Sequence, residues 1–124
     1  MDILISNSSD KPIYEQITSQ IKAMIMSGKL AAGEPLPSIR HMAKELRVSV
    51  ITTKRAYEDL ERDGFIETFP GKGSFVAARN LALIREEQLK AVEARLAEAV
   101  DIAKRSGITL DELTEMMKLL YEEE

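Results

Sequence analysis

The chain has 124 residues, no cysteine and a formal net charge of −4 at neutral pH. This length fits one domain, or one small domain with an appendage, and the lack of cysteine excludes disulfides and thiol chemistry. The sequence has no run of about twenty apolar residues and no basic-then-apolar leader, so we expect a cytoplasmic protein without a membrane segment. Residues 1–79 carry 11 Lys/Arg and 10 Asp/Glu (+1), whereas residues 80–124 carry 6 and 11 (−5).

The first quarter of the chain predicts an arm followed by a helix. Residues 1–10 are mostly polar and indicate either a loose arm or a short extended segment that packs on the body. Asp10 and Pro12 predict a helix start, with a capping carboxylate and a proline in the first turn. Apolar residues recur every three or four positions over residues 13–25, which predicts one buried face, and Gly28 ends the helix.

Residues 38–63 predict two short helices joined by a tight turn. Ser38 and Ser49 each stand where a side chain can cap a helix, and Gly64 ends the second helix. In that second helix the core side is marked by Ala56, Tyr57 and Leu60, and the N-terminal residues face the other way. Those residues are hydroxyls, a lysine and small apolar groups, which suit phosphates, base edges and thymine methyls in a major groove.

A two-stranded hairpin is predicted over residues 65–77. The β-prone runs on either side enclose a turn with two glycines and one cation, Gly71-Lys72-Gly73. A small wing with lysine and bare backbone at its tip can enter a minor groove or lie along phosphates. The order of elements therefore indicates a winged helix-turn-helix, a module that reads DNA.

The last third of the chain predicts two amphipathic helices. The first runs from Arg79-Asn80 to about Ser106, and Thr109 with Glu112 forms a capping box for the second. About 45 residues cannot bury two apolar stripes alone, so we expect a second copy of the chain to cover them. The alternative is that the hairpin folds back onto its own winged helix. The expected dimer interface consists of Leu89, Val92, Leu96, Ala99, Ala103, Leu110, Leu113, Met117 and Leu120.

Several motifs, in this order and spacing, resemble the GntR family of bacterial transcription regulators. They are Pro12-Ile13-Tyr14, the LPSIR run at 36–40, Gly64-Phe65-Ile66 and the GKGSFV run at 71–76. The similarity covers residues 11–79, and the short tail resembles the YtrA-type subfamily. It implies a mainly α fold with a small sheet (α+β): an N-terminal winged helix-turn-helix, a strand in loop 29–37 that pairs with the wing, and a dimerisation hairpin over 80–124.

The resemblance also implies which residues bind DNA. Arg40 matches the arginine that reaches DNA from the first helix of the motif. Val50 and Ile51 depart from the pattern, because many relatives carry arginine and asparagine there. We hypothesise that they contact thymine methyls; the alternative is that one packs inward or contacts nothing. The full expected set is Ser38, Arg40, Ser49, Val50, Ile51, Thr52, Lys54, Gly71, Lys72 and Gly73.

The function implied is that of a homodimeric regulator that represses transcription from an inverted-repeat operator and blocks polymerase. YtrA-type relatives often sit with transporter genes, and a small effector, unidentified, would bind at the dimer interface or beside the tail. No catalytic motif, cofactor site or metal site is expected: His41 is the single histidine, and Gly71-Lys72-Gly73 lacks the length of a P-loop.

The alternative function is a winged helix that binds protein, with the acidic tail as a docking hairpin. Enzymes that fuse such a head to an aminotransferase-like domain need several hundred more residues.

Overall fold

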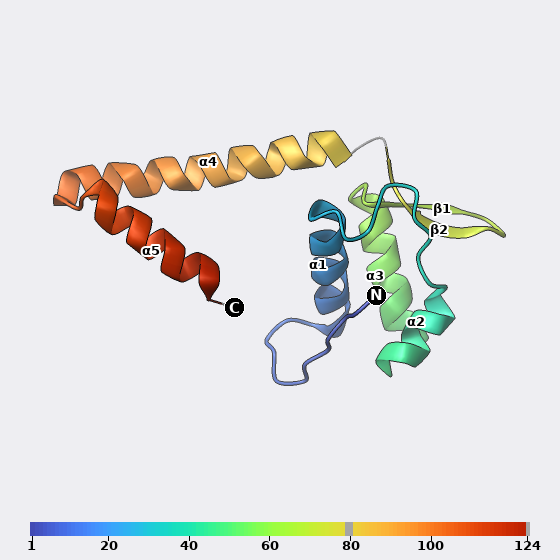
Figure 1. Ribbon diagram of the computed structural model, residues 1–124. Helices are drawn as coiled ribbons and strands as arrows, with labels where there is room; N and C mark the ends of the chain where they lie inside the picture. The colour runs from blue at the N-terminus through green and yellow to red at the C-terminus, as the bar shows by residue number, and fades with distance from the viewer. Residues whose placement is uncertain (79–80, 124) are drawn as a thin grey trace. The chain divides into compact units, whose positions relative to one another are not determined.

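The computed structural model describes residues 1–78 and 81–123, which form a mainly helical fold with one small sheet. One compact unit covers Met1–Arg85 and a second begins at Glu86. This mainly helical fold with one small sheet confirms the expected fold class. In chain order (Figure 1), the elements are α1 (Ile13–Met26), α2 (Ile39–Leu46), α3 (Val50–Arg62), β1 (Ile66–Phe69), β2 (Gly73–Val76), α4 (Leu81–Ser106) and α5 (Leu110–Glu122).

The core of the first unit lies between α1 and α3. These two helices run side by side in Figure 1, and α2 packs across α3. Ile17 and Ile21 on α1 and Leu60 on α3 are completely buried, as the three-four spacing predicts. Ile66 at the start of the wing is also buried, so the hairpin is anchored to the same core.

The N-terminal arm packs on α1 as an extended segment, and two glutamines hold it there. Gln20 accepts a hydrogen bond from the Leu4 N–H (2.9 Å) and donates one to the Leu4 carbonyl (2.8 Å). Gln16 makes the same pair of bonds with Ser6 and donates a further one to the Lys11 carbonyl. The second of the two sequence interpretations, a packed segment, is therefore the correct one.

The predicted cap of α1 is wrong. The helix begins at Ile13 with Pro12 at the N-cap position, and no side chain caps it. Asp10 lies two residues before this position, and proline itself has no side-chain oxygen that could accept from the first-turn amides. The remaining caps were predicted correctly: Ser38 caps α2, Ser49 caps α3, and Thr109 and Glu112 form the capping box of α5.

The loop before α2 extends the wing, as the family resemblance implied. β1 and β2 are antiparallel, with Ile66 opposite Val76 and Phe69 opposite Gly73. Pro35 forms an isolated bridge with Phe75 on the outer edge of β2. Backbone bonds flank this bridge, from the Val76 N–H to the Glu34 carbonyl (2.9 Å) and from the Leu36 N–H to the Ser74 carbonyl (2.9 Å). The loop therefore fixes the wing relative to the start of α2.

The predicted boundary between the winged-helix domain (11–79) and the helical tail (80–124) falls at residues that the structure does not describe. The expected start of the tail helix at Arg79-Asn80 lies outside the described residues, and α4 is seen from Leu81. Leu81 and Ile84 pack against the core of the first unit, so this unit reaches Arg85. Within the second unit α4 and α5 diverge from their connection at Gly107 and make few contacts with each other (Figure 1). None of the helices seen in residues 1–78 and 81–123 is both long enough and apolar enough to span a membrane.

Candidate nucleic-acid interface

The start of α2 is held by a cap and by a buried tyrosine. The Ser38 hydroxyl accepts a hydrogen bond from the His41 N–H (3.1 Å), which places Arg40 in the exposed first turn. The Tyr57 hydroxyl, on α3, donates to the Pro37 carbonyl at 2.7 Å. Tyr57 is 3% exposed, and burial raises the pKa of its phenol well above the ordinary value, so it remains a donor. Together these bonds fix Arg40 relative to α3.

The turn between α2 and α3 contains a strained residue. Arg47 has φ 57° and ψ 44°, a left-handed conformation that costs a residue with a β-carbon about 1 kcal/mol. Its N–H and that of Val48 bond back to carbonyls of α2, the latter to Ala43 at 3.0 Å. This conformation ends α2 and directs the chain into Ser49, so α3 starts close to the end of α2.

Hydroxyl groups organise the first turn of α3. The Ser49 side chain accepts from the Thr52 N–H (3.0 Å) and donates to the Thr52 hydroxyl (2.8 Å). Thr53, which is fully buried, donates its hydroxyl to the Ser49 carbonyl. Capping by Ser49 is therefore confirmed, and the Thr52 hydroxyl hydrogen is left free to point away from the helix.

The outward face of this turn carries the apolar pair that departs from the family pattern. Val50 is 48% exposed and Ile51 is 82% exposed, so neither packs inward. Lys54 is exposed one turn further on. Exposed β-branched residues at the start of a helix are not needed for its packing, and this favours a role in contact with another molecule.

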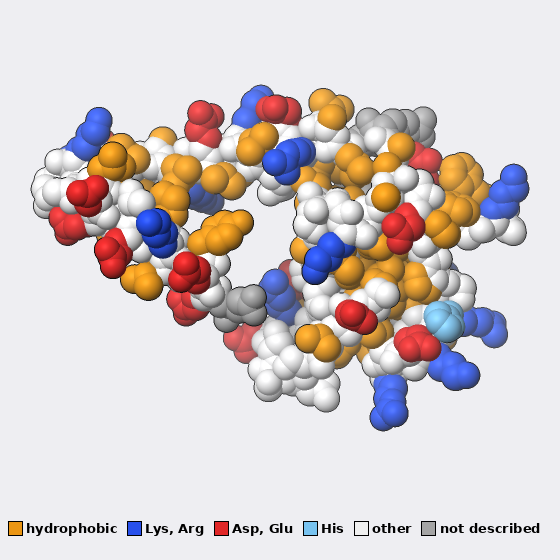
Figure 2. All heavy atoms as spheres, viewed as in Figure 1, with side chains coloured by type: hydrophobic (Ala, Val, Ile, Leu, Met, Phe, Trp, Pro, Cys, Tyr) orange, Lys and Arg blue, Asp and Glu red, His pale blue; other side chains and the backbone are white. Residues whose placement is uncertain are grey.

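The wing presents a single lysine between two glycines. Gly71 and Gly73 have φ of +77° and +107°, which only glycine adopts readily, and Lys72 between them is exposed. The rings of Phe69 and Phe75 lie 6.0 Å apart at the base of the turn and stiffen the hairpin. Figure 2 shows Lys and Arg side chains projecting over α2 and at the tip of the wing. Cations therefore lie on α2 and on the wing, in the same compact unit as the exposed start of α3.

Bacterial regulatory proteins of the gntR family match residues 13–76, just over half of the chain. The chain belongs to this family. The match spans α1 through β2, which is the part of the chain that builds the surface described above. The expected family is thereby confirmed, and with it the function of a DNA-binding transcription regulator rather than an enzyme.

Individual gntR-family relatives are similar to this chain beyond residues 13–76 as well. The HTH-type transcriptional repressor YtrA of Bacillus subtilis is 33% identical over 116 residues, which cover 94% of this chain and 89% of that protein. A GntR family transcriptional regulator from Listeria monocytogenes is 28% identical, with a TM-score of 0.68, and covers 92% of this chain and 97% of that one. The DNA-binding domain of AraR, solved in complex with operator ORX1, is 26% identical with a TM-score of 0.55, over 62% and 96% of the two chains.

The predicted DNA-binding residues lie on one compact unit of this gntR-family chain, and their contacts with DNA stay predictions. The sequence interpretation missed two tertiary contacts beside them. One is the Tyr57–Pro37 bond; Tyr57 was assigned only to the core. The other is the guanidinium of Arg55, which lies 3.7 Å from the ring centroid of Tyr14 on α1. No local signal could reveal these contacts, because their partners are 20 and 41 residues apart in sequence.

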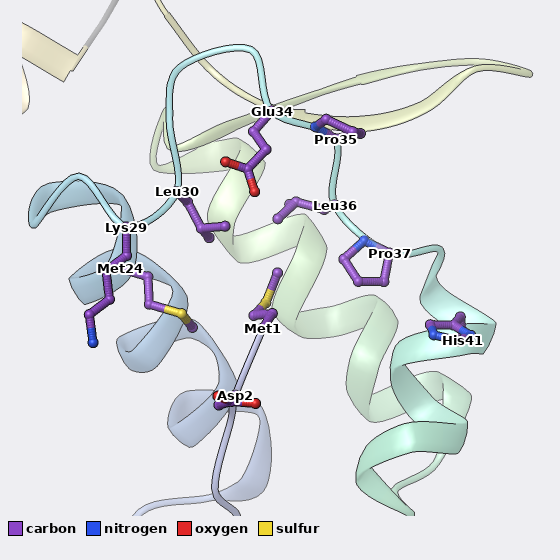
Figure 3. A pocket seen from close by; sticks show the side chains of 10 residues that line it. All are labelled: Met1, Asp2, Met24, Lys29, Leu30, Glu34, Pro35, Leu36, Pro37 and His41. Atoms are coloured by element: carbon purple, nitrogen blue, oxygen red, sulfur yellow. The ribbon is translucent and has the colours of Figure 1, made fainter.

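A separate hollow of about 670 Å³ lies between the arm, α1 and the loop before α2. Figure 3 shows Met1, Leu30 and Leu36 pointing into it, with Glu34 above them and His41 at its edge on α2. Among the described residues no group of three or more His, Cys, Asp or Glu side chains is placed to hold a metal ion. Six of the ten residues that line the hollow are apolar.

Proposed function

We propose that this gntR-family regulator is a repressor that binds an inverted-repeat operator as a homodimer. The observation that carries the proposal is the exposed first turn of α3, which shares one compact unit with the exposed Arg40 on α2 and Lys72 on the wing. A recognition helix presents its N-terminal residues to base edges in the major groove. The name of the Bacillus relative, a repressor, and the operator complex of AraR support the assignment.

In this proposal each residue has a distinct task. Arg40, Lys54 and Lys72 bind phosphates or base acceptors, and the hydroxyls of Ser38, Ser49 and Thr52 contact the backbone beside them. Gly71 and Gly73 let the wing backbone approach DNA closely. Val50 and Ile51 contact thymine methyls, which predicts A·T pairs in each half-site. Their exposure, 48% and 82%, supports this role.

The apolar faces of α4 and α5 support the homodimer. Few contacts join the two helices, and Figure 2 shows apolar side chains along both. Leu96 and Met117 are 42% and 49% exposed in the single chain, and Leu113 is half-buried. Ala103 differs, because only 2% of it is exposed where α4 meets α5, so little of its area is left for a second chain. The remaining exposed residues of the proposed interface are Leu89, Val92, Ala99, Leu110 and Leu120.

A dimer explains how a weakly charged head can bind DNA specifically. Two recognition helices related by a two-fold axis read half-sites about one helical turn, roughly 34 Å, apart. Linking two modules raises the effective concentration of the second, which compensates for a head with a net charge of only +1 over residues 1–79. Bound at a promoter, the dimer would exclude polymerase. The proposal places the protein in the cytoplasm, with transporter genes as its target class.

The test is selection of bound sites from a random duplex pool at a stated salt concentration. The proposal predicts enrichment of an inverted repeat, with A·T pairs in the arms. Val50→Ala should then relax the preference at one base pair of each arm, and an unchanged preference would remove the thymine-methyl hypothesis. If the folded protein enriches no sequence, operator binding is wrong, and docking to a protein partner becomes the better explanation.

A further inference from the structure

The outward face of α3 continues beyond the residues assigned above, to Arg55. Residues four apart in a helix lie on the same face, so Arg55 follows Ile51, which is 82% exposed. Glu58 comes next on this face and brings a negative charge. Arg55 is therefore the last cation along the exposed face of α3 before the face becomes acidic.

The side chain of Arg55 is held in place by an aromatic ring from another helix. Its guanidinium carbon lies 3.7 Å from the ring centroid of Tyr14, the second residue of α1. Tyr14 is half-buried, and α1 packs along α3, so the ring is a rigid support. Stacking occupies one flat face of a guanidinium and leaves the N–H groups at its edge free to donate.

No carboxylate neutralises this cation in the described part of the chain. Arg55 forms no ion pair there, although Asp59 stands four residues further along the same helix. Asp59 instead binds Arg62, at 2.9 Å. Arg62 also approaches Asp63, at 3.5 Å. Arg62 is therefore paired within the protein, while Arg55 is positioned by a ring and has no carboxylate partner among the described residues.

We propose that the Tyr14–Arg55 stack is a binding site for a phosphate of the DNA backbone. The inference rests on the proposed function, because it requires α3 to lie against a duplex. The planar fork of arginine matches phosphate oxygens, and the ring restricts the side chain before DNA arrives, so less rotamer freedom is lost on binding. A phosphate contact sets the register of the recognition helix and carries no sequence information. Its loss must therefore affect every duplex alike.

The first experiment compares two variants with the same change in charge, Arg55→Gln and Arg62→Gln. Binding to the selected operator and to a random-sequence duplex is measured by fluorescence anisotropy between about 50 and 200 mM salt. We expect Arg55→Gln to weaken binding to both duplexes by about tenfold at the lowest salt. The slope of log affinity against log salt should become shallower by about 0.9 for each Arg55 in contact. Arg62→Gln should leave this slope at the parent value.

The second experiment tests the ring, with thermal unfolding measured in parallel. Tyr14→Phe keeps the stack and should bind like the parent, whereas Tyr14→Leu should weaken binding to both duplexes. Combined with Arg55→Gln, Tyr14→Leu should cause no further loss, because the two residues act as one unit.

Three results would overturn the proposal while leaving the operator assignment intact. The first is that Arg55→Gln has the same salt slope as the parent. The second is that Arg55→Gln loses affinity for the operator only, which would indicate a base contact. The third is that Tyr14→Leu lowers affinity equally whether position 55 is arginine or glutamine. If the parent itself binds neither duplex, the proposed function fails and this site fails with it.

Discussion

At the scale of single residues, the surface depends on side chains that lie behind it. Tyr57 is the main example: its buried hydroxyl joins α3 to the carbonyl just before the cap of α2. Without that bond Ser38 and Arg40 would lose one of the contacts that fix them relative to α3. The exposed residues are the ones proposed to contact DNA, and the buried residues behind them hold them in position.

Tyr57→Phe should destabilise the chain by about 1 kcal/mol, because the Pro37 carbonyl loses its donor while the ring still fills the core. Urea unfolding followed by circular dichroism measures this loss. Tyr121→Phe is the matched control, since Tyr121 is 89% exposed and should be neutral. Equal stability of both variants would mean that water replaces the tyrosine as the donor.

Arg40→Ala should cost about 1–3 kcal/mol in binding to the selected operator, because the proposed function places this exposed arginine of the first turn of α2 against the duplex. Lys29→Ala, beyond the C-terminal end of α1, removes the same charge and should change affinity far less. The oligomeric state of both variants should match the parent. Operator affinity at the parent level in Arg40→Ala would show that the residue is misassigned.

At the scale of elements, the end of α3 is tied to α1 by charge. The Lys22 ammonium donates to the Asp63 carboxylate at 2.9 Å and also lies 5.1 Å from the ring centroid of Phe65. Asp63 is the C-cap residue of α3, so this pair fixes the helix just before the chain turns into the wing. The hydrogen bond from Lys22 lowers the pKa of the Asp63 carboxyl.

A lowered carboxyl pKa stabilises the folded state above the unfolded value of about 4, and this contribution is lost as the pH falls through the folded pKa. Both partners are about one-third exposed, so Asp63→Asn should cost less than about 1 kcal/mol at pH 7. Below pH 4 its stability should fall less steeply than that of the parent, as urea unfolding at pH 7 and pH 3 will reveal. Asp2→Asn is the control, and equal acid sensitivity of all three proteins would contradict the role of the pair.

At the scale of the whole molecule, the two units differ in how far they bury their own apolar side chains. The first unit buries its own core around Ile17, Ile21 and Leu60. The second unit leaves large apolar side chains of α4 and α5 exposed, and Ala103 is the single hydrophobic residue buried among its described positions. The proposed dimer accounts for this difference.

Leu96→Glu should convert the proposed dimer into a monomer, because a carboxylate would enter the apolar interface and lose its hydration. Light scattering coupled to size exclusion measures the mass, and Glu93→Gln, a polar change nearby on α4, should leave it at twice the chain mass of 13.9 kDa. Operator affinity of Leu96→Glu should fall steeply, since a single head lacks a linked partner. A parent that is monomeric at micromolar concentration would exclude this mode of binding.

The sequence by itself determined the features that depend on neighbours within one helical turn. Ser38, Ser49 and Thr109 cap amides three residues away, and left-handed glycines follow α1, α3 and α4, whereas the left-handed Arg47 ends α2. Periodicity assigned the buried faces for the same reason. Asp10 was misjudged because it lies two residues before the N-cap position, which Pro12 occupies without a side-chain acceptor.

Only the tertiary structure decided how distant residues meet. The Tyr57–Pro37 bond, the Arg55–Tyr14 stack and the Lys22–Asp63 pair join positions 20 to 41 residues apart. Such contacts arise from the packing of α1 and α3 around one core, and no local pattern encodes them. The helices and the residues at their ends could therefore be predicted from the sequence. The positions of the side chains that would contact DNA followed only from the fold.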